Sequence, residues 1–547
     1  MSIDAYLRDR FEPASLKKAA TAALALGVGA AIALGIVLRA HRRGDRGADV
    51  APRRPPRALP VIKQLSSLDT QYLALEGPRH TGHFATLGIY DPSTAPNRML
   101  TAASMVELLG ERMHLLSPLR WRLAAVPLGL DYPYLVPDQH CDLSYHVREA
   151  ALTEPGDDRQ LAALVARLHS RPLDRTRPLW EMYVISGLAS GRVAIYIKLH
   201  HAVADGLSGT EMLGALLDVD PQQEPDRPPD LTEPQRHPSR RQMWGLGLSG
   251  VSRHPARMLG SAPRVLPNLE ETSLAGVPGA ARLGRLAGRA GALGKGNGNR
   301  VLPPVLKAPK TSFNARISPH RCCAFGQIDL ARVKQVKQAH QVTVNDVVVS
   351  MCAGAVRRWL HDHDELLNEP LIAQIPVSSR SDEHAGTYGN RIQTLAVPLH
   401  TQIANPVLRL QQTAASLLQM KERNSALPRG LLVDANHLVP PFLATQAVRA
   451  TFALATSALG RPTWNLVVSN VPGPQLPLYC RGARLVALYP LSLITDGMGL
   501  NITVLSYDGR LDIGIVADRE QMPDVWTLLD GLESSLSELE HAKPAVA

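Results

Sequence analysis

Residues 192–206 read RVAIYIKLHHAVADG, and this stretch decides how the rest of the chain is interpreted. Residues 192–199 are rich in β-branched and apolar side chains, a composition that predicts a buried β-strand. Two adjacent histidines, His200 and His201, follow directly. The pattern therefore predicts a strand that delivers two histidines to a short turn.

Histidine is the side chain whose ordinary pKa allows it to take and return a proton near neutral pH. Such chemistry requires a fixed ring, and a turn closed by Gly206, which adopts positive φ freely, can supply that rigidity. Asp205 lies four residues after His201 and can support the turn through an ion pair or a backbone cap. We therefore expect general acid–base chemistry at this turn.

Metal binding and simple packing are the alternative interpretations of the histidine pair. Adjacent histidines point to opposite sides of an extended chain and rarely bind one ion, so we expect no metal. No GxSxG elbow or catalytic cysteine context supports covalent catalysis. The glycine-rich GKGNGNR at residues 294–300 follows no predicted strand, which makes it a weak phosphate-binding candidate.

The composition of the 547-residue chain, 45% hydrophobic and 20% charged, is that of a globular protein with two to four domains. It excludes whole-chain disorder and a polytopic membrane protein. Only 4% of the residues are aromatic, which argues against stacking surfaces for single-stranded nucleic acid. We therefore expect no nucleic-acid partner. The five cysteines form no CxxC pair, so we expect reduced, mostly buried thiols.

The net charge of +10 is concentrated in two segments. Residues 1–60 contain 11 Lys and Arg against 5 Asp and Glu, and residues 227–310 contain 14 against 4. The remainder is mildly acidic. Basic segments without aromatic residues fit an anionic membrane surface at least as well as nucleic acid.

Residues 19–38, AATAALALGVGAAIALGIVL, are 20 residues without a charge. As a helix they would span about 30 Å, the hydrocarbon thickness of a bilayer. Arg39 stands where signal-peptide cleavage requires a small residue, so we expect an uncleaved anchor rather than a signal peptide. A buried Ala-rich helix is the alternative. The excess of Lys and Arg after the segment predicts that the catalytic body faces the cytoplasm.

The distribution of Pro, Gly and charge divides the chain into an N-terminal anchor with a Pro/Arg linker, a first lobe, a basic Pro/Gly/Ala-rich connector and a second lobe, at residues 1–60, 61–220, 221–310 and 311–540. Within the connector, arginines recur at helical spacing beside leucines over residues 280–293. This segment is predicted either to form a basic amphipathic helix on a membrane or to remain a disordered connector.

Both lobes mix helices and strands without a repeated βαβ unit, which favours α+β layers over a doubly wound sheet. Helical periodicity predicts helices at 65–76, 100–109, 159–168, 209–217, 330–339 and 344–360. Besides 192–199, strands are predicted at 322–328, 371–376, 393–399, 464–468, 484–488, 501–507 and 510–516. Asp508-Gly509 between the last two strands predicts a hairpin turn.

His200-His201-x-x-x-Asp205-Gly206 resembles the HHxxxDG motif of CoA-dependent acyltransferases. The surrounding sequence is similar to the bacterial wax ester synthase/acyl-CoA:diacylglycerol acyltransferase family over about residues 61–220 and 310–535. The matching stretches are LSSLDTQYLALE at 65–76, PLDRTRPLWE at 172–181, VTVNDVVV at 342–349, PVSSR at 376–380, Gly389-Asn390 and SNVPGP at 469–474. The N-terminal anchor departs from the family pattern.

The resemblance implies two chloramphenicol-acetyltransferase-like lobes with the active-site channel between them. It implies that His201 is the general base for the acceptor hydroxyl, which attacks the acyl-CoA thioester without an acyl-enzyme. His200 would support the site and Gly206 the turn. Asp205 would be a structural acid paired with an arginine, for which Arg380 is the candidate.

The resemblance also assigns roles outside the motif. Trp180 would line or support the acyl channel, Asn345 would lie near the substrate, and Asp346 would start a helix and pack the lobes. The implied co-substrate is acyl-CoA, with no cofactor. The implied acceptor is diacylglycerol or a long-chain alcohol, taken from a membrane or lipid-droplet surface, and the sequence does not choose between the two.

Two other functions are weighed against this one. A condensation-domain-like synthase shares HHxxxDG but uses carrier-bound donors, and no carrier-protein motif occurs in the chain. A non-catalytic lipid-binding scaffold would not require both histidines.

Overall fold

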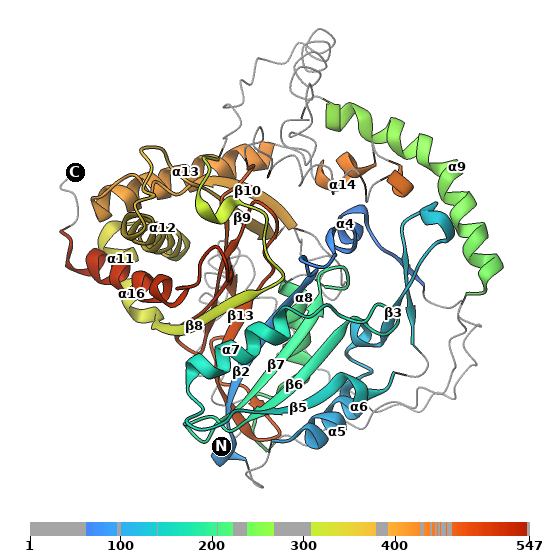
Figure 1. Ribbon diagram of the computed structural model, residues 1–547, viewed down its shortest axis with the longest axis horizontal. Coiled ribbons are helices and arrows are strands. Elements are labelled where there is room, and N and C mark those ends of the chain that lie inside the picture. The colour runs from blue at the N-terminus through green and yellow to red at the C-terminus, as the bar shows by residue number, and fades with distance from the viewer. Residues whose placement is uncertain are drawn as a thin grey trace, which may run out of the picture.

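The structure is a computed structural model (Figure 1) that describes residues 62–95, 100–138, 141–204, 206–222, 238–266, 268, 308–378, 392–426, 431–437, 440–443, 446, 449, 456 and 462–543. The predictions for residues 19–38 and 280–293, and for the Asp205–Arg380 ion pair, lie outside the described residues. Within the part of the chain that is described, no helix combines the length and the apolar character needed to cross a bilayer.

Two six-stranded sheets form the framework. The first has the order β12-β13-β2-β7-β6-β5, with bounds Tyr479–Cys480, Ala483–Leu491, His83–Asp91, Val193–His200, Trp180–Ser186 and Val147–Ala151. The second has the order β10-β9-β11-β14-β15-β8, with bounds Ile392–Pro398, Ile372–Ser378, Leu466–Pro472, Leu500–Tyr507, Arg510–Asp518 and Arg321–Asp329. A small sheet contains β1, β4 and β3 (Lys63–Gln64, Tyr134–Pro137 and Trp121–Ala124).

The helices pack around the sheets (Figure 1). In the first half they are α4, α5, α6, α7 and α8, at Ser67–Leu75, Ala102–Arg112, Leu143–His146, Asp158–His169 and Gly206–Leu216. In the second half they are α11, α12, α13, α14 and α16, at Leu330–His340, Val344–Asp362, Pro406–Ala426, Leu431–Asn436 and Trp526–His541. Along the chain, helix α9 (Arg240–Val265) comes between these two groups of helices.

Local sequence signals account for many of these boundaries. Ser66 and Asp69 form a capping box that starts α4, and Thr343 and Asp346 form one that starts α12. The predicted hairpin is confirmed, because Tyr507 pairs with Arg510 across a turn in which Asp508 and Gly509 both have positive φ.

Three large apolar clusters make up most of the core in the described residues. One lies between the first sheet and helices α5 and α8, and another lies between the second sheet and helices α12 and α16. The third combines α7 and β2 with β8 and β13, so it is shared by both halves of the chain. The lobes are therefore joined by a continuous core.

The strand predicted at residues 484–488 forms, but it joins the first sheet and not the second. It is part of β13, which pairs with β2 of the first sheet, from Arg484 opposite Asp91 to Leu491 opposite Ala85. Gly514 of β15 permits β13 to lie close to β15, because a Cβ at this position would lie 1.7 Å from the Pro490 carbonyl oxygen of β13. Local sequence could not predict the pairing of β13, because the residue pattern of a strand does not indicate which strand it will pair with.

The connector predicted at residues 221–310 contains the long helix α9, which local sequence did not predict. Pro255 and Pro263 lie inside it together with four glycines, and these six residues weaken any prediction from helix propensity. Its start is encoded locally, because Ser239 and Gln242 form a capping box.

Asp512 connects the two sheets through buried hydrogen bonds. Its carboxylate accepts a hydrogen bond from the Leu488 backbone N–H of β13 at 2.6 Å and from Gln327 Nε2 of β8 at 2.7 Å. Burial raises the pKa of Asp512 from 3.8 to about 6, although both hydrogen bonds act to lower it.

A carboxyl group with a raised pKa in the folded state loses stabilising free energy as pH rises. The contribution of Asp512 is fully present below about pH 4 and is lost as pH rises through about 6. Relative to Asp512→Asn, the wild type should lose about 1 to 3 kcal/mol of unfolding free energy between pH 4 and pH 7. Urea unfolding of both proteins across this range measures the difference. Parallel pH profiles would contradict the prediction.

Candidate active site

The two histidines stand at the end of β7, in the middle of the first sheet. His200 pairs with His83 of β2, and its backbone N–H donates to the Leu179 carbonyl beside β6 at 3.0 Å. The next residue, His201, donates its backbone N–H to the Gly82 carbonyl at 2.8 Å. Neighbouring strands on both sides therefore fix the backbone of the pair.

The ring of His200 holds the turn that follows. Its Nδ1 accepts a hydrogen bond from the Ala202 backbone N–H at 2.9 Å. Since Nδ1 is an acceptor, a neutral ring has its proton on Nε2, which lies 3.1 Å from Glu76 Oε1. The fully buried His200 thus connects the turn to a carboxylate, and both of its ring nitrogens face protein groups.

Glu76 directly follows α4 and is the centre of this network. Its Oε1 accepts from the Gly82 backbone N–H at 3.0 Å, and its Oε2 accepts from Arg175 Nε at 2.8 Å. Burial alone would raise the pKa of Glu76, but the contacts with His200, Arg175 and Gly82 outweigh it and lower the pKa to about 2. The carboxylate is therefore ionised throughout the physiological range.

Gly82 is the position at which this packing admits no side chain. A Cβ there would lie 2.5 Å from His200 Nε2 and 3.0 Å from the Tyr72 carbonyl oxygen. Its carbonyl holds His201 and its N–H binds Glu76, so its backbone takes part on both sides of the site.

His201 is enclosed by aromatic rings. Tyr72 of α4 stacks on it with centroids 4.8 Å apart and an interplanar angle of 17°, and Phe84 of β2 lies 4.7 Å away. The residue is 9% exposed. Burial, followed by the nearby His200 and His169, lowers the pKa of His201 to about 3. The imidazole is therefore an uncharged base at neutral pH.

A narrow apolar cavity shares Phe84 with the surroundings of the His201 ring. It lies between β2, β6 and β7 on one side and α8 on the other. Of the lining residues that the structure describes, Thr86 is polar and the others are Phe84, Leu116, Leu119, Trp180, Met182, Ile197, Leu199, Gly209, Met212, Leu213 and Leu216. The cavity suits an unbranched apolar chain.

Trp180, selected from the sequence, forms part of that wall. Its Nε1 donates to the Leu119 carbonyl at 2.8 Å, and its ring stacks on His146 with centroids 4.4 Å apart. Both contacts fix the orientation of a side chain that is 1% exposed. Trp180 therefore gives the cavity a rigid boundary.

The other sequence candidates are placed elsewhere. Asp346 caps α12 by accepting from the Thr343 backbone N–H at 2.8 Å, and Asn345 accepts from Asn470 of β11 at 3.3 Å. Both belong to the second lobe. Gly206 is the first residue of α8, whereas Asp205 and Arg380 lie outside the described residues.

The site adjoins the junction of the two lobes. His80, two residues before Gly82, has its Nε2 3.2 Å from Asp496 Oδ1, and the neighbouring Arg79 lies 3.7 Å from Oδ2 of the same carboxylate. In the described ranges, no group of three or more His, Cys, Asp or Glu side chains is arranged to hold a metal ion.

The sequence did not identify the residues that surround the histidines, namely Tyr72, Glu76, Gly82, Phe84 and Arg175. Three of these lie in stretches that carried the family resemblance, Tyr72 and Glu76 in LSSLDTQYLALE and Arg175 in PLDRTRPLWE. The signal was therefore present, but nothing local indicates that either stretch reaches His200.

Comparisons with known proteins identify the family of the chain. Residues 65–348 match the family model of the wax ester synthase/diacylglycerol acyltransferase catalytic domain, and residues 388–540 match that of the WS/DGAT C-terminal domain. A protein of Mycobacterium tuberculosis named "probable diacyglycerol O-acyltransferase" is 36% identical over 484 residues, which cover 87% of this chain and 98% of that protein.

Solved structures show the same fold. The wax ester synthase/diacylglycerol acyltransferase from Marinobacter aquaeolei is 29% identical with a TM-score of 0.62, over 87% of this chain and 98% of that one. A starter condensation domain of rhizomide synthetase, solved with C8-CoA, is 14% identical with a TM-score of 0.50, over 89% and 97%. The predicted α+β fold of two domains is thus confirmed. The chain belongs to the wax ester synthase/diacylglycerol acyltransferase family of enzymes.

Proposed function

We propose that the protein transfers a fatty acyl group from acyl-CoA to diacylglycerol and so forms triacylglycerol, with long-chain alcohols as alternative acceptors that yield wax esters. The observation that carries the proposal is an uncharged, buried imidazole, His201, beside an apolar cavity. The names of the relatives support the acceptor. Acyl-CoA is the co-substrate, and the reaction needs no cofactor.

The chemistry is a direct transfer. His201 takes the proton of the acceptor hydroxyl while the oxygen attacks the thioester carbonyl carbon. The C–S bond then breaks, and the proton passes from His201 to the CoA thiolate, so that ester and free CoA are the products. The low pKa of His201 keeps its imidazole unprotonated at neutral pH. The negative charge that develops on the oxygen during attack stabilises the transient positive charge of the protonated imidazole.

The apolar cavity is the proposed place of the fatty acyl chain. It begins at Phe84, next to His201, and continues between the sheet and α8, so a chain within it would keep its thioester beside the base. Burial of methylene groups supplies about 0.8 kcal/mol each. The expectations of a channel between the lobes, of Asn345 near the substrate and of an Asp205–Arg380 ion pair belong to the same proposal.

We further propose that residues 19–38 anchor the protein in a membrane with the catalytic body on the cytoplasmic side. Their 20 uncharged residues and the arginines that follow them support this. The full-length protein should then stay in membranes through a high-salt wash, whereas a protein starting at Val61 should become salt-extractable. Release of the full-length protein by salt alone would overturn the anchor.

The acceptor is tested by competition. Purified protein with radiolabelled acyl-CoA should label triacylglycerol when diacylglycerol and hexadecanol are offered together. Labelled product that is wax ester alone would reassign the acceptor, and absence of any transfer would refute the function.

Replacement of His201 should abolish most catalysis. We expect His201→Ala to lower kcat by about 10²- to 10⁴-fold, the usual scale for a lost general base. His200→Ala should cost less, because His200 positions the turn. Since the pKa of His201 is about 3, kcat/KM should show no acid limb near pH 6.5 in the wild type. A folded His201→Ala protein with near-normal turnover would exclude the mechanism.

Glu76 is a positioning residue whose loss should act through His200. In Glu76→Gln, the amide nitrogen cannot accept a hydrogen bond, so one of the three groups that face the carboxylate loses its acceptor. We expect kcat to fall about 10- to 100-fold with KM for acyl-CoA unchanged, because Glu76 does not line the cavity.

Gly82→Ala displaces the same imidazole by a different route and should reproduce this kinetic pattern, whereas Glu76→Asp, which keeps the charge, should recover part of kcat. A merely structural role would instead lower the melting temperature with kcat per folded molecule preserved.

The cavity should set the length of the acyl chain. Leu213→Trp fills space opposite the sheet, so we expect the preferred acyl-CoA to shorten by several carbons while turnover of short donors is retained. Leu408→Trp, at a side chain that is 45% exposed on α13, is the matched control. The measurement is kcat/KM over a series of acyl-CoA lengths. An unchanged length profile would place the acyl chain elsewhere.

A further inference from the structure

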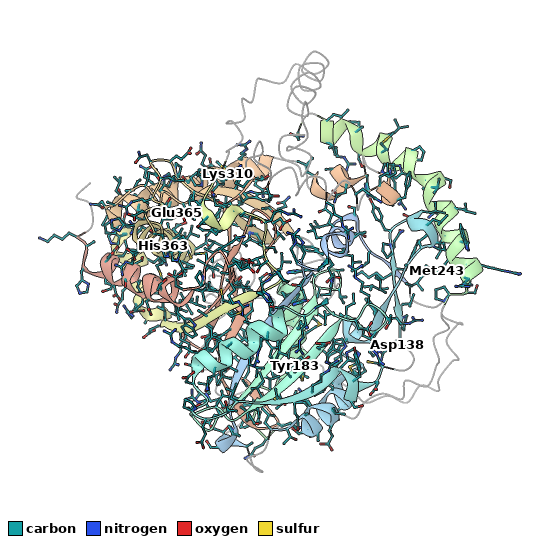
Figure 2. The ribbon with its side chains drawn as sticks, viewed as in Figure 1. Asp138, Tyr183, Met243, Lys310, His363 and Glu365 are labelled. Carbon is teal, nitrogen blue, oxygen red and sulfur yellow. The ribbon has the colours of Figure 1, made fainter. Side chains whose placement is uncertain are left out.

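Helix α9 lies along the outside of the molecule, where Figure 1 shows its outer side facing away from the body. Its inner side is closely packed. Gly247 would place a Cβ 2.8 Å from Val126, and Gly250 would place one 2.2 Å from Asp131, so both glycines permit close contact with η3 (Pro127–Gly129) and the chain around it. Met243, labelled in Figure 2, is buried on the same helix.

Ion pairs fix the orientation of α9. Arg257 lies 3.1 Å from Asp131 Oδ1, and Arg264 lies 2.8 Å from Asp434 Oδ2 of α14. Packing and charge together determine which face of the helix points outward.

One side of the exposed surface of α9 is apolar. Five large apolar side chains are exposed on it, two of them by more than half, with Leu248 at 61% and Leu259 at 68%. At 100° per residue they fall within about a third of the helix circumference. The set is Trp244, Leu248, Val251, Met258 and Leu259. We name these five residues the α9 stripe.

The apolar surface continues beyond the helix. Leu128 of η3 is 79% exposed, and the chain at the neighbouring Gly129 approaches Phe442, which is 50% exposed. Exposed apolar surface of this extent, on the elements that α9 itself packs against, is typical of an interaction site.

The charge of α9 indicates which partner fits the stripe. The helix contains five arginines and neither Asp nor Glu. Arg240 and Arg241 at its start and Arg253 midway are exposed to solvent. A helix that combines an apolar face with exposed cations is complementary to a surface with an apolar interior and anionic headgroups.

The helix is also connected to the site. Asp434 of α14 holds Arg264, and the next-but-one residue of α14, Asn436, accepts a hydrogen bond from Gln71 of α4 at 2.6 Å. Tyr72 of α4 stacks on His201. One helix therefore separates the α9 stripe from the helix that covers the general base.

We propose that the α9 stripe inserts into the headgroup region of an anionic phospholipid bilayer. Contact through α9 holds the first lobe against the surface in a fixed orientation, independently of residues 19–38. The inference concerns binding to lipid and is measured without substrate, so its failure and failure of the proposed acyl transfer are separate results.

Trp244 provides a local probe in the full-length protein. The experiment compares wild type with Trp244→Phe on vesicles whose phospholipids have brominated acyl chains, and the difference in fluorescence isolates this one of the six tryptophans. We expect quenching of Trp244 on vesicles that contain phosphatidylglycerol, and little on phosphatidylcholine alone or in high salt.

Leu248→Asp should weaken insertion of α9 by about tenfold or more, the scale of losing one buried leucine. Leu418→Asp, at a side chain that is 60% exposed on α13, should leave Trp244 quenching unchanged. Both changes are at exposed positions, so the melting temperature should not move. Replacing both Arg240 and Arg241 by Gln should remove the preference for anionic lipid without altering the apolar face.

Three results would overturn the proposal: Trp244 unquenched on anionic vesicles, equal quenching in the Leu248→Asp protein, or protection of Trp244 by self-association at rising protein concentration without any effect of lipid. The last would assign the stripe to a second copy of this chain.

Discussion

The buried carboxylate of Glu76 is the contact on which the site depends. It faces the His200 ring, the Gly82 backbone N–H and the Arg175 side chain, which come from three separate parts of the first lobe. Removing its partners would leave the Glu76 charge buried and unpaired, which costs about 3–5 kcal/mol. Because the His200 ring binds Ala202 and the Gly82 carbonyl binds His201, this one carboxylate determines the position of His201, the proposed general base.

Strand β13 gives this network a rigid frame. It carries chain from the second half into the first sheet beside β2, the strand that pairs with β7 and its two histidines. Asp512 of the second sheet accepts a hydrogen bond from the backbone of β13. The apolar cluster that includes α7, β8 and β13 packs between the two halves of the chain. Movement between the lobes would therefore disturb the strand next to the catalytic turn.

Local signals predicted a large part of the fold. The β7 strand, the Asp508-Gly509 hairpin and helices such as α11 and α12 follow from periodicity, caps and turn residues, all of which act over a few positions. The strand that pairs with β13 could not be predicted, because the residue pattern of a strand is the same whichever sheet the strand joins. Helix α9 was also missed, since its prolines and glycines oppose intrinsic propensity and packing against η3 and α14 overrides them.

The site divides in the same way. His200 and His201 were evident because both sit in one short motif, and Trp180 was evident from the family resemblance. Glu76 and Arg175 were not, although both lie in recognised stretches, because the contact between them exists only after α4 and the loop before β6 have folded together. Long-range carboxylate contacts are the part of an active site that sequence periodicity does not encode.

The burial of His201 also bears on which acceptor reacts. A base that activates a lipid hydroxyl can equally activate water, and water attack on the thioester would merely hydrolyse acyl-CoA. Tyr72 and Phe84 cover the His201 ring and leave it 9% exposed, so few water molecules can reach the imidazole. An apolar acceptor gains free energy by replacing that water, whereas water gains none. In the proposed reaction, the enclosure that lowers the pKa of His201 therefore also favours ester synthesis over hydrolysis.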